Sequence, residues 1–575
     1  MKKLLVYLKE YTKETVLGPL FKLMEATLEL FVPLVVAAII DTGIACNDTG
    51  RIVKMSLLLV VLGAIGLALA VTAQYFSAKA AVGFVARIRH ALFAHIQRFS
   101  YAQLDKLGTS TLITRMTSDA NQVQNGVNLT LRLLLRSPFV VFGAMIMAFT
   151  IDVPSALIFA VVIPVLCVVV FGIMLTCIPL YKKVQQRLDA VLGVTRGNLT
   201  GVRVLRAFCK EEEQQQLFEE KNKDLTVTQK FVGRISALMN PVTYVIINIA
   251  IIVLIHTGAL RVEAGILTQG AVVALYNYMS QILTELVKMA NLIINITKAV
   301  ACGNRIQSVL DLQPDMEILP DTGAGADEFK VEFDEVNLRY PGAAELSLEN
   351  ITLRVYAGET VGIIGGTGSG KSSLVNLIPR FYDTVSGAVR VDGKDVKSWN
   401  SEALRDRIGI VPQKAVLFHG TIRENLLWGN ANATDDDLWA ALRVAQAEDV
   451  VRSKDGGLDA IVEQGGRNIS GGQRQRLPIA RALVRKPDIL ILDDSASALD
   501  FATDAALRKA LRTLQPSPTV FIVSQRTSSL QHADRILVLD DGQCVGIGTH
   551  EQLLASCEVY REIHDSQFKK EAKQA

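Results

Sequence analysis

Residues 365–372 read GGTGSGKS and lie between the short apolar run ETVGIIG and the apolar-periodic run SLVNLIPRF. A strand, a glycine loop and a helix start bring several backbone N–H groups toward phosphate oxygens at the positive end of a helix dipole. Lys371 adds a point charge for the β- and γ-phosphates, and the Ser372 hydroxyl is placed to bind Mg²⁺. We therefore predict an α/β domain that binds ATP through Gly365, Gly366, Thr367, Gly368, Ser369, Gly370, Lys371, Ser372 and Ser373.

Four further motifs follow the glycine loop in order. They are VPQ with Gln413, NISGGQRQR, ILILDD with Asp493 and Asp494, and SALD ending at Asp500. On these motifs, residues 331–575 resemble the nucleotide-binding domain of an ABC transporter. The signature ISGGQ departs from the usual LSGGQ only at Ile469, which keeps an apolar side chain.

The resemblance implies a role for each motif. Tyr340 in LRYPG would stack on adenine, although simple packing of this tyrosine is the alternative. Ser372, Gln413 and Asp493 would supply hard oxygen ligands to Mg²⁺, and Gln413 would also sense the membrane domain. Asp500 would communicate across a dimer of cassettes. The signature would act on the ATP of a partner chain through Ser470, Gly471, Gly472 and Gln473.

The signature precedes a proline that is unusual for a helix. Pro478 lies some eight residues into the helix expected to start at Ser470. Proline inside a helix costs about 3 kcal/mol because it removes a backbone hydrogen bond and clashes with the preceding turn. We expect either a kink or a local bulge there.

The other half of the chain is a membrane domain. Half of the 575 residues are hydrophobic and only 20% are charged, which is too apolar for an ordinary soluble enzyme of this length. The apolar residues are concentrated before about residue 300. Stretches of roughly 20 residues with few charges, the length that a bilayer requires, predict six spans. They lie at about 16–40, 55–78, 137–151, 153–181, 235–260 and 264–284.

The charge distribution predicts the orientation of these spans. Two long segments, 79–136 and 182–234, are rich in Lys and Arg, whereas the connections near 41–54 and 258–265 carry few charges. Positive charge on the retained side places the N-terminus, both long segments and the C-terminal domain in the cytoplasm, in a multi-pass protein of the cytoplasmic membrane. Helical spacing in ARIRHALFAHIQRF predicts that the spans continue as helices beyond the membrane.

The predicted architecture has three parts. A polytopic α-helical membrane domain of six transmembrane helices with long cytoplasmic extensions spans residues 1–300, and a Pro-, Gly- and acid-rich linker spans 301–330. An α/β P-loop ATP-binding cassette domain spans 331–575. By resemblance to exporters of this family, the regions around 104–116 and 201–214 contain coupling helices, and Phe208 is a candidate plug for a cassette groove.

Two candidate catalytic residues depart from the family pattern. Asp494 follows Asp493 where cassettes usually carry Glu, and Gln525 in FIVSQR stands where His is expected. Attack on the γ-phosphate needs a carboxylate that orients water and a polar group that stabilises the transferred phosphoryl group. Asp is one methylene shorter than Glu, and a misplacement of about 1 Å costs roughly 10²-fold in rate. We predict tight ATP binding and weak hydrolysis at this site.

These features together resemble the degenerate-site subunit of heterodimeric bacterial ABC exporters, often multidrug exporters. The expected partner is a homologous half-transporter with intact catalytic Glu and His, and the expected cofactors are ATP and Mg²⁺. The expected function is ATP-driven export of a small molecule, drug, lipid or peptide. A slow homodimeric exporter and a nucleotide-gated membrane regulator are the alternatives.

Charged residues also occur at membrane depth. Glu25 and Glu29 lie one helical turn apart in the first span, and Arg132 and Arg136 are similarly spaced before the third. Such charges face a bundle interior, a cavity or one another. Glu25 and Glu29 are candidates for the translocation path, with structural ion pairs as the alternative. Glu285, near the end of the sixth span, is interpreted as marking its exit into the cytoplasm.

Overall fold

The computed structural model describes residues 1–316, 328–495, 497 and 499–571. The chain forms two compact units. The first comprises Met1–Gln97 and Ser110–Gln313, and the second comprises Arg98–Thr109 and Pro314–Ala575. The short segment Arg98–Thr109 therefore belongs to the cassette unit although it lies within the membrane half of the sequence.

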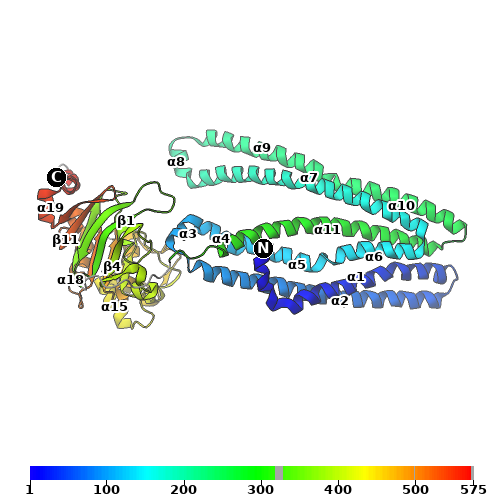
Figure 1. Ribbon diagram of the computed structural model, residues 1–575, viewed down its shortest axis with the longest axis horizontal. Helices are drawn as coiled ribbons and strands as arrows, with labels where there is room; N and C mark the ends of the chain where they lie inside the picture. Colours follow the sequence, from blue (N-terminus) through cyan, green and yellow to red (C-terminus); the bar gives the residue numbers. More distant parts are fainter. Residues whose placement is uncertain (317–327, 496, 498, 572–575) are drawn as a thin grey trace. The chain divides into compact units, whose positions relative to one another are not determined.

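The first unit is entirely helical (Figure 1). It contains six helical segments that are long and apolar enough to cross a membrane, which confirms the predicted number of spans within the described part of the chain. These segments are Lys3–Ile44, Thr49–Ile96, Thr109–Ile151, Val153–Thr200, Glu211–Glu263 and Gln269–Leu310. Several are interrupted locally by changes of helix type.

The helices of this half of the sequence have the following bounds. They are η1 (Lys2–Tyr11), α1 (Thr12–Ala38), η2 (Ile39–Ile44), α2 (Thr49–Ile96), α3 (Tyr101–Leu107), α4 (Thr109–Thr114), η3 (Arg115–Asp119), α5 (Ala120–Leu133), α6 (Arg136–Ile151), α7 (Val153–Thr200), α8 (Val202–Ala207), α9 (Glu211–Ala237), α10 (Met239–Glu263) and α11 (Gln269–Leu310). Helices α2 and α7 each have 48 residues. Because about 20 residues cross a bilayer, both continue well beyond it, as predicted.

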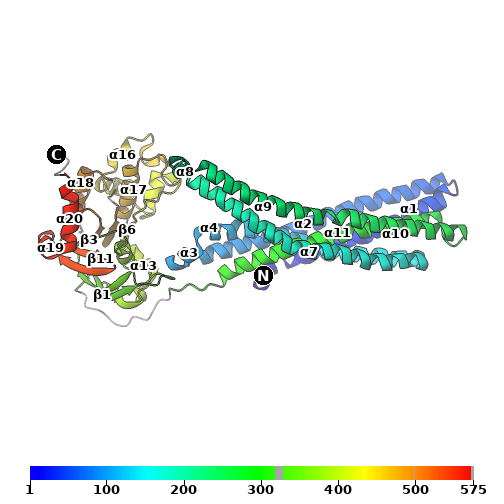
Figure 2. The same cartoon turned by 90° about the horizontal axis from the view of Figure 1, so that it is seen from above.

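Small and apolar side chains fill the interior of the membrane unit. Ala26 of α1, Ala144 of α6 and Ala274 of α11 are fully buried, and small residues allow helices to approach closely in a membrane. The buried Tyr278 hydroxyl donates a hydrogen bond of 2.6 Å to the carbonyl of Leu30. Helix α7 packs along α9 and α10, as both views show (Figures 1 and 2).

The second unit is built on three sheets. The six-stranded sheet has the order β12-β11-β3-β10-β9-β6, in which only the edge strand β12 is antiparallel to its neighbour. The four-stranded sheet β2-β1-β4-β5 is antiparallel, and β7 pairs with β8. The strands are β1 (Val331–Leu338), β2 (Leu348–Val355), β3 (Thr360–Gly365), β4 (Ser386–Val391), β5 (Lys394–Asp395), β6 (Ile408–Val411), β7 (Gly420–Thr421), β8 (Ile461–Val462), β9 (Ile489–Asp493), β10 (Thr519–Val523), β11 (Arg535–Asp540) and β12 (Gln543–Gly548).

Burial explains the parallel sheet. Every residue of β9 and β10 is buried, as are all but the first of β3. Continuous apolar runs of this kind are typical of strands covered by helices on both faces. The helices of the second unit that follow β1 are α12 (Lys371–Val375), η4 (Val396–Ser398), α13 (Ser401–Asp406), α14 (Ile422–Leu427), α15 (Asp435–Val444), α16 (Glu448–Arg452), η5 (Gly457–Asp459), α17 (Gly471–Val484), α18 (Phe501–Arg512), η6 (Thr527–Ser529), α19 (His550–Ser556) and α20 (Glu558–Glu571).

Two expectations from the sequence, for Pro478 and for the linker, can be compared with the structure. Helix α17 runs without interruption through the buried Pro478, so the proline neither ends the helix nor introduces a bulge. Helix α11 continues to Leu310, inside the range 301–330 that was expected to be linker. Residues 317–327 of that range lie outside the described residues.

Candidate functional site

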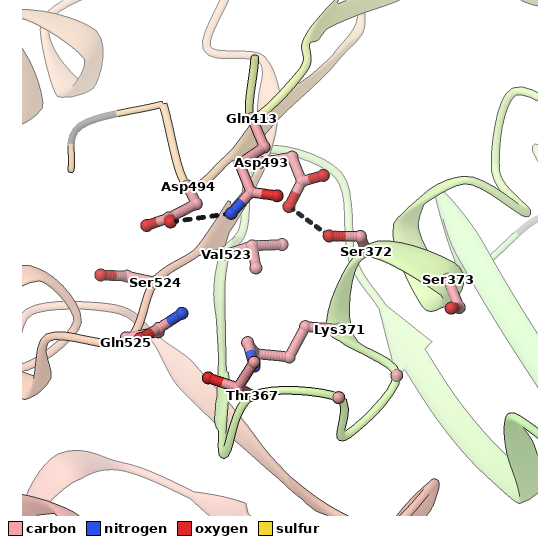
Figure 3. A pocket seen from close by; sticks show the side chains of 12 residues that line it. Thr367, Lys371, Ser372, Ser373, Gln413, Asp493, Asp494, Val523, Ser524 and Gln525 are labelled. Carbon is pink, nitrogen blue, oxygen red and sulfur yellow. Dashed lines mark hydrogen bonds between the residues drawn. The ribbon is translucent and has the colours of Figure 1, made fainter. Parts of the chain in front are cut away.

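The carboxyl ends of three adjacent strands meet at one cavity of the cassette unit. Strand β3 leads into the glycine loop, β9 ends at Asp493, and β10 ends at Val523, immediately before Ser524 and Gln525. In open α/β sheets, ligands bind at this edge. The cavity has a volume of about 200 Å³ and is lined by Thr367, Gly368, Gly370, Lys371, Ser372, Ser373, Gln413, Asp493, Asp494, Val523, Ser524 and Gln525 (Figure 3).

The glycine loop needs a glycine where it turns into α12. Gly370 has a φ of 92°, in the left-handed region, and a Cβ there would lie 2.7 Å from the carbonyl oxygen of Ser347. A side chain would therefore collide with fixed backbone in addition to straining the loop. This tight approach allows the backbone to pass directly into the first turn of α12, which begins at Lys371.

Lys371 is a buried cation at the start of α12. Its side chain is 9% exposed, and Nζ donates to the carbonyl of Gly365 at 3.0 Å and to that of Gly366. Burial lowers the pKa of Lys371, against the opposing influence of Asp494 and Asp493. Gly365, Gly366 and Ser369, also predicted to bind ATP, do not line the cavity; the two glycines accept from Lys371, and Ser369 Oγ lies 3.4 Å from Nζ.

Two oxygen groups suited to a hard cation lie side by side in the cavity. Ser372 Oγ donates to Asp493 Oδ1 at 2.9 Å (Figure 3). Burial raises the pKa of Asp493, and the neighbouring Asp494 raises it further, while Ser372 and Lys371 act in the opposite direction. A carboxylate and a hydroxyl in this arrangement fit the ligand preference of Mg²⁺, which favours oxygen donors.

Asp494 occupies a left-handed backbone conformation directly after β9. Its φ is 45°, and its N–H donates to the carbonyl of Val523 at 3.0 Å. Its own carbonyl accepts from Ser497 Oγ at 2.9 Å. The carboxylate Oδ2 accepts from Gln413 Nε2 at 3.3 Å (Figure 3). The side chain is therefore directed toward Gln413, the glutamine that the family resemblance predicts as a Mg²⁺ ligand.

Gln525 lines the same cavity and is held through its backbone. Its carbonyl accepts from Nε2 of Gln567 at 2.7 Å. Oε1 of Gln567 in turn accepts from the N–H and the hydroxyl of Thr527, both at 3.0 Å. Sequence reasoning missed Gln567 because a lone glutamine in a polar C-terminal helix carries no motif. No hydrogen bond joins the Gln525 side-chain amide to another described residue.

Tyr340 does not line the cavity but lies beside its wall. The Tyr340 hydroxyl donates to Ser373 Oγ at 2.9 Å. Its ring meets the ring of Tyr382 edge-on, with centroids 4.9 Å apart and planes at 84°. Sequence reasoning did not single out Tyr382, since FYD is not a recognisable motif.

The signature lies at a helix start outside the cavity. Ser470 precedes α17, and its N–H donates to Oε1 of Gln473 at 3.4 Å. Neither these residues nor the glycines between them line the cavity with Lys371. Asp500 begins α18, where Oδ2 accepts from the N–H of Thr503 at 3.2 Å, and this hydrogen bonding lowers the pKa of Asp500.

In the membrane unit, Glu25 and Glu29 are both ion-paired. Glu25 pairs with Lys22 at 2.5 Å, and Glu29 pairs with Arg136 at 2.6 Å. Arg136 also binds Glu285 at 2.6 Å, so this cluster joins α1, α6 and α11. Glu285 is only 4% exposed and serves to hold helices together, a role that differs from the expected marking of a span end.

Comparison with known proteins identifies both halves. Residues 15–286 match the family described as ABC transporter transmembrane region, and residues 348–497 match the family described as ABC transporter. An uncharacterised ABC transporter ATP-binding protein of Mycobacterium tuberculosis is 38% identical over 571 residues, which cover 98% of this chain and 97% of the relative.

A more distant relative and a solved structure agree with this assignment. The ATP-dependent lipid A-core flippase of Syntrophus aciditrophicus is 32% identical over 497 residues, covering 85% of this chain and 81% of the flippase. The structure of a bacterial Atm1-family ABC exporter with ATP bound shares the fold, with a TM-score of 0.78, 22% identity and 98% coverage of each chain. The chain therefore belongs to the ABC transporter family, whose cassettes bind ATP and couple its hydrolysis to transport, and it carries one membrane domain and one cassette in the exporter fold.

Proposed function

We propose that this chain is the degenerate-site half of a heterodimeric ABC exporter in the cytoplasmic membrane, with its N-terminus and cassette in the cytoplasm. One observation carries the proposal. A single cavity combines a complete phosphate and metal side, Lys371, Ser372 and Asp493, with Asp494 and Gln525 at the positions that perform hydrolysis. The site therefore keeps the groups that bind ATP, whereas the groups that would hydrolyse it depart from the family pattern.

The binding side uses groups already oriented for their task. The Lys371 ammonium and the N–H groups at the start of α12 neutralise phosphate charge. Mg²⁺ supplies charge neutralisation between the phosphate oxygens, and Ser372, Asp493 and Gln413 would hold it. Tyr340 stacks on the adenine ring. Tight nucleotide binding follows from a buried cation whose contacts are the carbonyls of Gly365 and Gly366 and the hydroxyl of Ser369, none of them a carboxylate.

The hydrolytic side is weaker for two reasons. The Asp494 carboxylate is shorter than that of Glu and is turned toward Gln413, at 3.3 Å. Gln525 donates a hydrogen bond but cannot carry a proton at neutral pH. A misplaced carboxylate at the attacking water costs about 10²-fold per ångström. The site holds ATP and turns it over slowly.

The signature motif serves the second ATP site of the dimer. Ser470, Gly471, Gly472 and Gln473 are retained at the exposed start of α17, away from the chain's own cavity. In a head-to-tail pair they complete the ATP site of a partner whose Glu and His perform the hydrolysis. Asp500 communicates between the two sites, and the regions around 104–116 and 201–214 are the candidate coupling helices.

The exported compound is a small molecule, drug, lipid or peptide. The relative named as a lipid A-core flippase makes an amphipathic lipid the first class to assay. Glu25 and Glu29 of α1 remain candidates for the path, and the 41% exposure of Glu29 leaves its carboxylate accessible beside Arg136.

The sharpest test restores the two catalytic residues. Asp494→Glu combined with Gln525→His should raise the ATPase rate of the purified full chain in nanodiscs by about 10²-fold, since both changes return groups to the γ-phosphate. Asp436→Glu, at an exposed position of α15, is the matched control and should change nothing. ATP affinity should stay the same in both variants.

Two results would contradict the proposal. Brisk hydrolysis by the unmodified chain alone would favour a homodimeric exporter with two active Asp494 sites. ATP-gated passive conductance in proteoliposomes, without accumulation of a tracer lipid or drug, would favour a membrane regulator. With the correct sister chain, substitution of the sister's catalytic Glu should abolish most activity, whereas Asp494→Asn should have little effect.

A further inference from the structure

A short helix from the membrane half of the sequence is anchored in the cassette unit. The ring of Tyr101 in α3 stacks on Phe381, with centroids 4.4 Å apart and planes at 27°. Asp105, one turn later, accepts a hydrogen bond of 2.8 Å from the hydroxyl of Tyr382. Both partners come from consecutive residues of the cassette, so α3 contacts one narrow site.

Tyr382 also contacts the residue proposed to bind the base. Its ring packs edge-on against Tyr340, and the Tyr340 hydroxyl donates to Ser373 in the first turn of α12, directly after the glycine loop. A continuous series of contacts therefore runs from Asp105 through Tyr382 and Tyr340 to Ser373. We call these four residues the tyrosine relay.

The segment that carries Tyr382 is held firmly. Arg405 places its guanidinium over the Phe381 ring, 5.3 Å from the centroid, and donates to the carbonyls of Pro379 and Arg380, each at 3.1 Å. Arg380 in turn binds both carboxylate oxygens of Asp383 at 2.7 and 3.0 Å. Arg405 thus fixes the backbone that precedes Tyr382, and Arg380 holds the Asp383 side chain that follows it, so a displacement of the Tyr382 ring is transmitted to its neighbours.

The hydroxyl of Tyr382 is kept as a donor. Burial, together with the neighbouring Asp105, raises the pKa of Tyr382, so the phenol stays protonated throughout the physiological range. Asp105 is exposed and has no competing hydrogen-bond partner among the described residues. The hydrogen bond from Tyr382 to Asp105 therefore depends on the position of α3 relative to the Tyr382 ring.

We propose that Tyr382 is a positioning residue that couples base stacking on Tyr340 to the docking of α3. The proposal rests on the proposed function in one respect, the contact between Tyr340 and adenine. The bond from Tyr382 to Asp105 holds the Tyr382 ring, and the ring edge holds Tyr340 in the orientation that adenine requires. By reciprocity, a bound base strengthens the docking of α3 by the same factor.

A double-mutant cycle on the full chain in nanodiscs tests this coupling. Tyr382→Phe keeps the ring and removes the hydroxyl, and Asp105→Ala removes the acceptor. Each should weaken ATP binding about 3- to 10-fold, the usual effect of one hydrogen bond. The double variant should be no weaker than either single one, because both remove the same bond. Additive losses would overturn the relay.

Inorganic tripolyphosphate separates a base effect from damage to the fold. It engages the glycine loop without a base, so its affinity should be unchanged in Tyr382→Phe and Asp105→Ala. Equal losses of tripolyphosphate and ATP would mean that the variants only disturb the cassette, and the proposal would fail. Tyr356→Phe, an exposed tyrosine elsewhere in the cassette, should leave both affinities unchanged.

Tyr340→Ala distinguishes the relay from the underlying base contact. If this change leaves the ratio of ATP to tripolyphosphate affinity unaltered, Tyr340 does not touch the base, and the base contact and the relay both fail. If it lowers the ratio while Tyr382→Phe does not, the base contact stands and the relay alone is wrong. The expected result is a lowered ratio in both variants.

Discussion

Two buried cations, one in each unit, are stabilised in opposite ways. Arg136 of the membrane unit is 7% exposed and binds the carboxylates of Glu285 and Glu29. Lys371 of the cassette is 9% exposed, and within the described residues its ammonium has carbonyl and hydroxyl contacts but no carboxylate in ion-pair range. A buried charge that is paired with carboxylates holds a fold together, whereas a buried charge without a carboxylate in ion-pair range is available to an anionic ligand.

The largest expected effect is on the paired cation. Arg136→Met removes one of the two cations that pair with the buried Glu285, because Lys288 remains at 2.9 Å. Removing one member of a buried pair costs about 3–5 kcal/mol, and we expect the lower end of that range here. Thermal unfolding of the full chain in detergent should therefore occur at a clearly lower temperature. Arg132→Met, one turn earlier and without an ion pair among the described residues, should unfold close to the wild type.

The double variant Arg136→Met, Glu285→Gln makes the test specific. Neutralising the Glu285 carboxylate, which then has only Lys288 as a cationic partner, should recover part of the lost stability. If the double variant were as unstable as the single one, the loss would come from packing, and the contrast between the two cations would be weaker.

The next effect concerns the unpaired cation. Lys371→Met should reduce ATP affinity by about 10²-fold, since truncating one partner of a buried charged contact costs about 2–5 kcal/mol. The nucleotide-free protein should nevertheless be at least as stable as the wild type, because a desolvated charge has been removed. Isothermal titration measures ATP affinity and thermal unfolding measures stability, and Lys509→Met, at an exposed position of α18, is the control. A destabilised Lys371→Met protein would show that this lysine has a structural role.

The smallest expected effect is a pH dependence that belongs to Lys371 alone. Burial lowers its pKa below the usual 10.5, so in the interval between the folded value and 10.5 the unfolded chain binds more protons than the folded one. Stability from this group therefore rises with pH across that interval. The difference in unfolding temperature between Lys371→Met and the wild type, without nucleotide, should narrow as pH approaches 10.5. A constant difference would indicate that the ammonium is well solvated.

The parts of the structure that sequence predicted are those encoded locally. The glycine loop, its strand and the start of α12 lie within a few residues of one another, and hydrophobic length alone marks six spans. Asp493 and Asp494 could be placed because a strand must deliver them to the loop. Each inference needed only a short window of sequence.

The parts that sequence missed depend on distant contacts. Arg136 and Glu285 are 149 residues apart, and Tyr382 and Asp105 are 277 apart. Gln567 reaches Gln525 across 42 residues from a helix without a motif. No periodicity links such pairs, so the ion-pair cluster, the tyrosine relay and the support of Gln525 become visible only when the chain is folded.

The backbone conformation at residue 494 restricts which side chains fit this position. With a φ of 45°, this position favours Asp and Asn, whose short side chains tolerate the left-handed region better than longer ones. A glutamate there would place its carboxylate further from the backbone, but it would strain the left-handed backbone conformation at residue 494 more than Asp does. The shorter side chain of Asp494 therefore suits the backbone that follows β9.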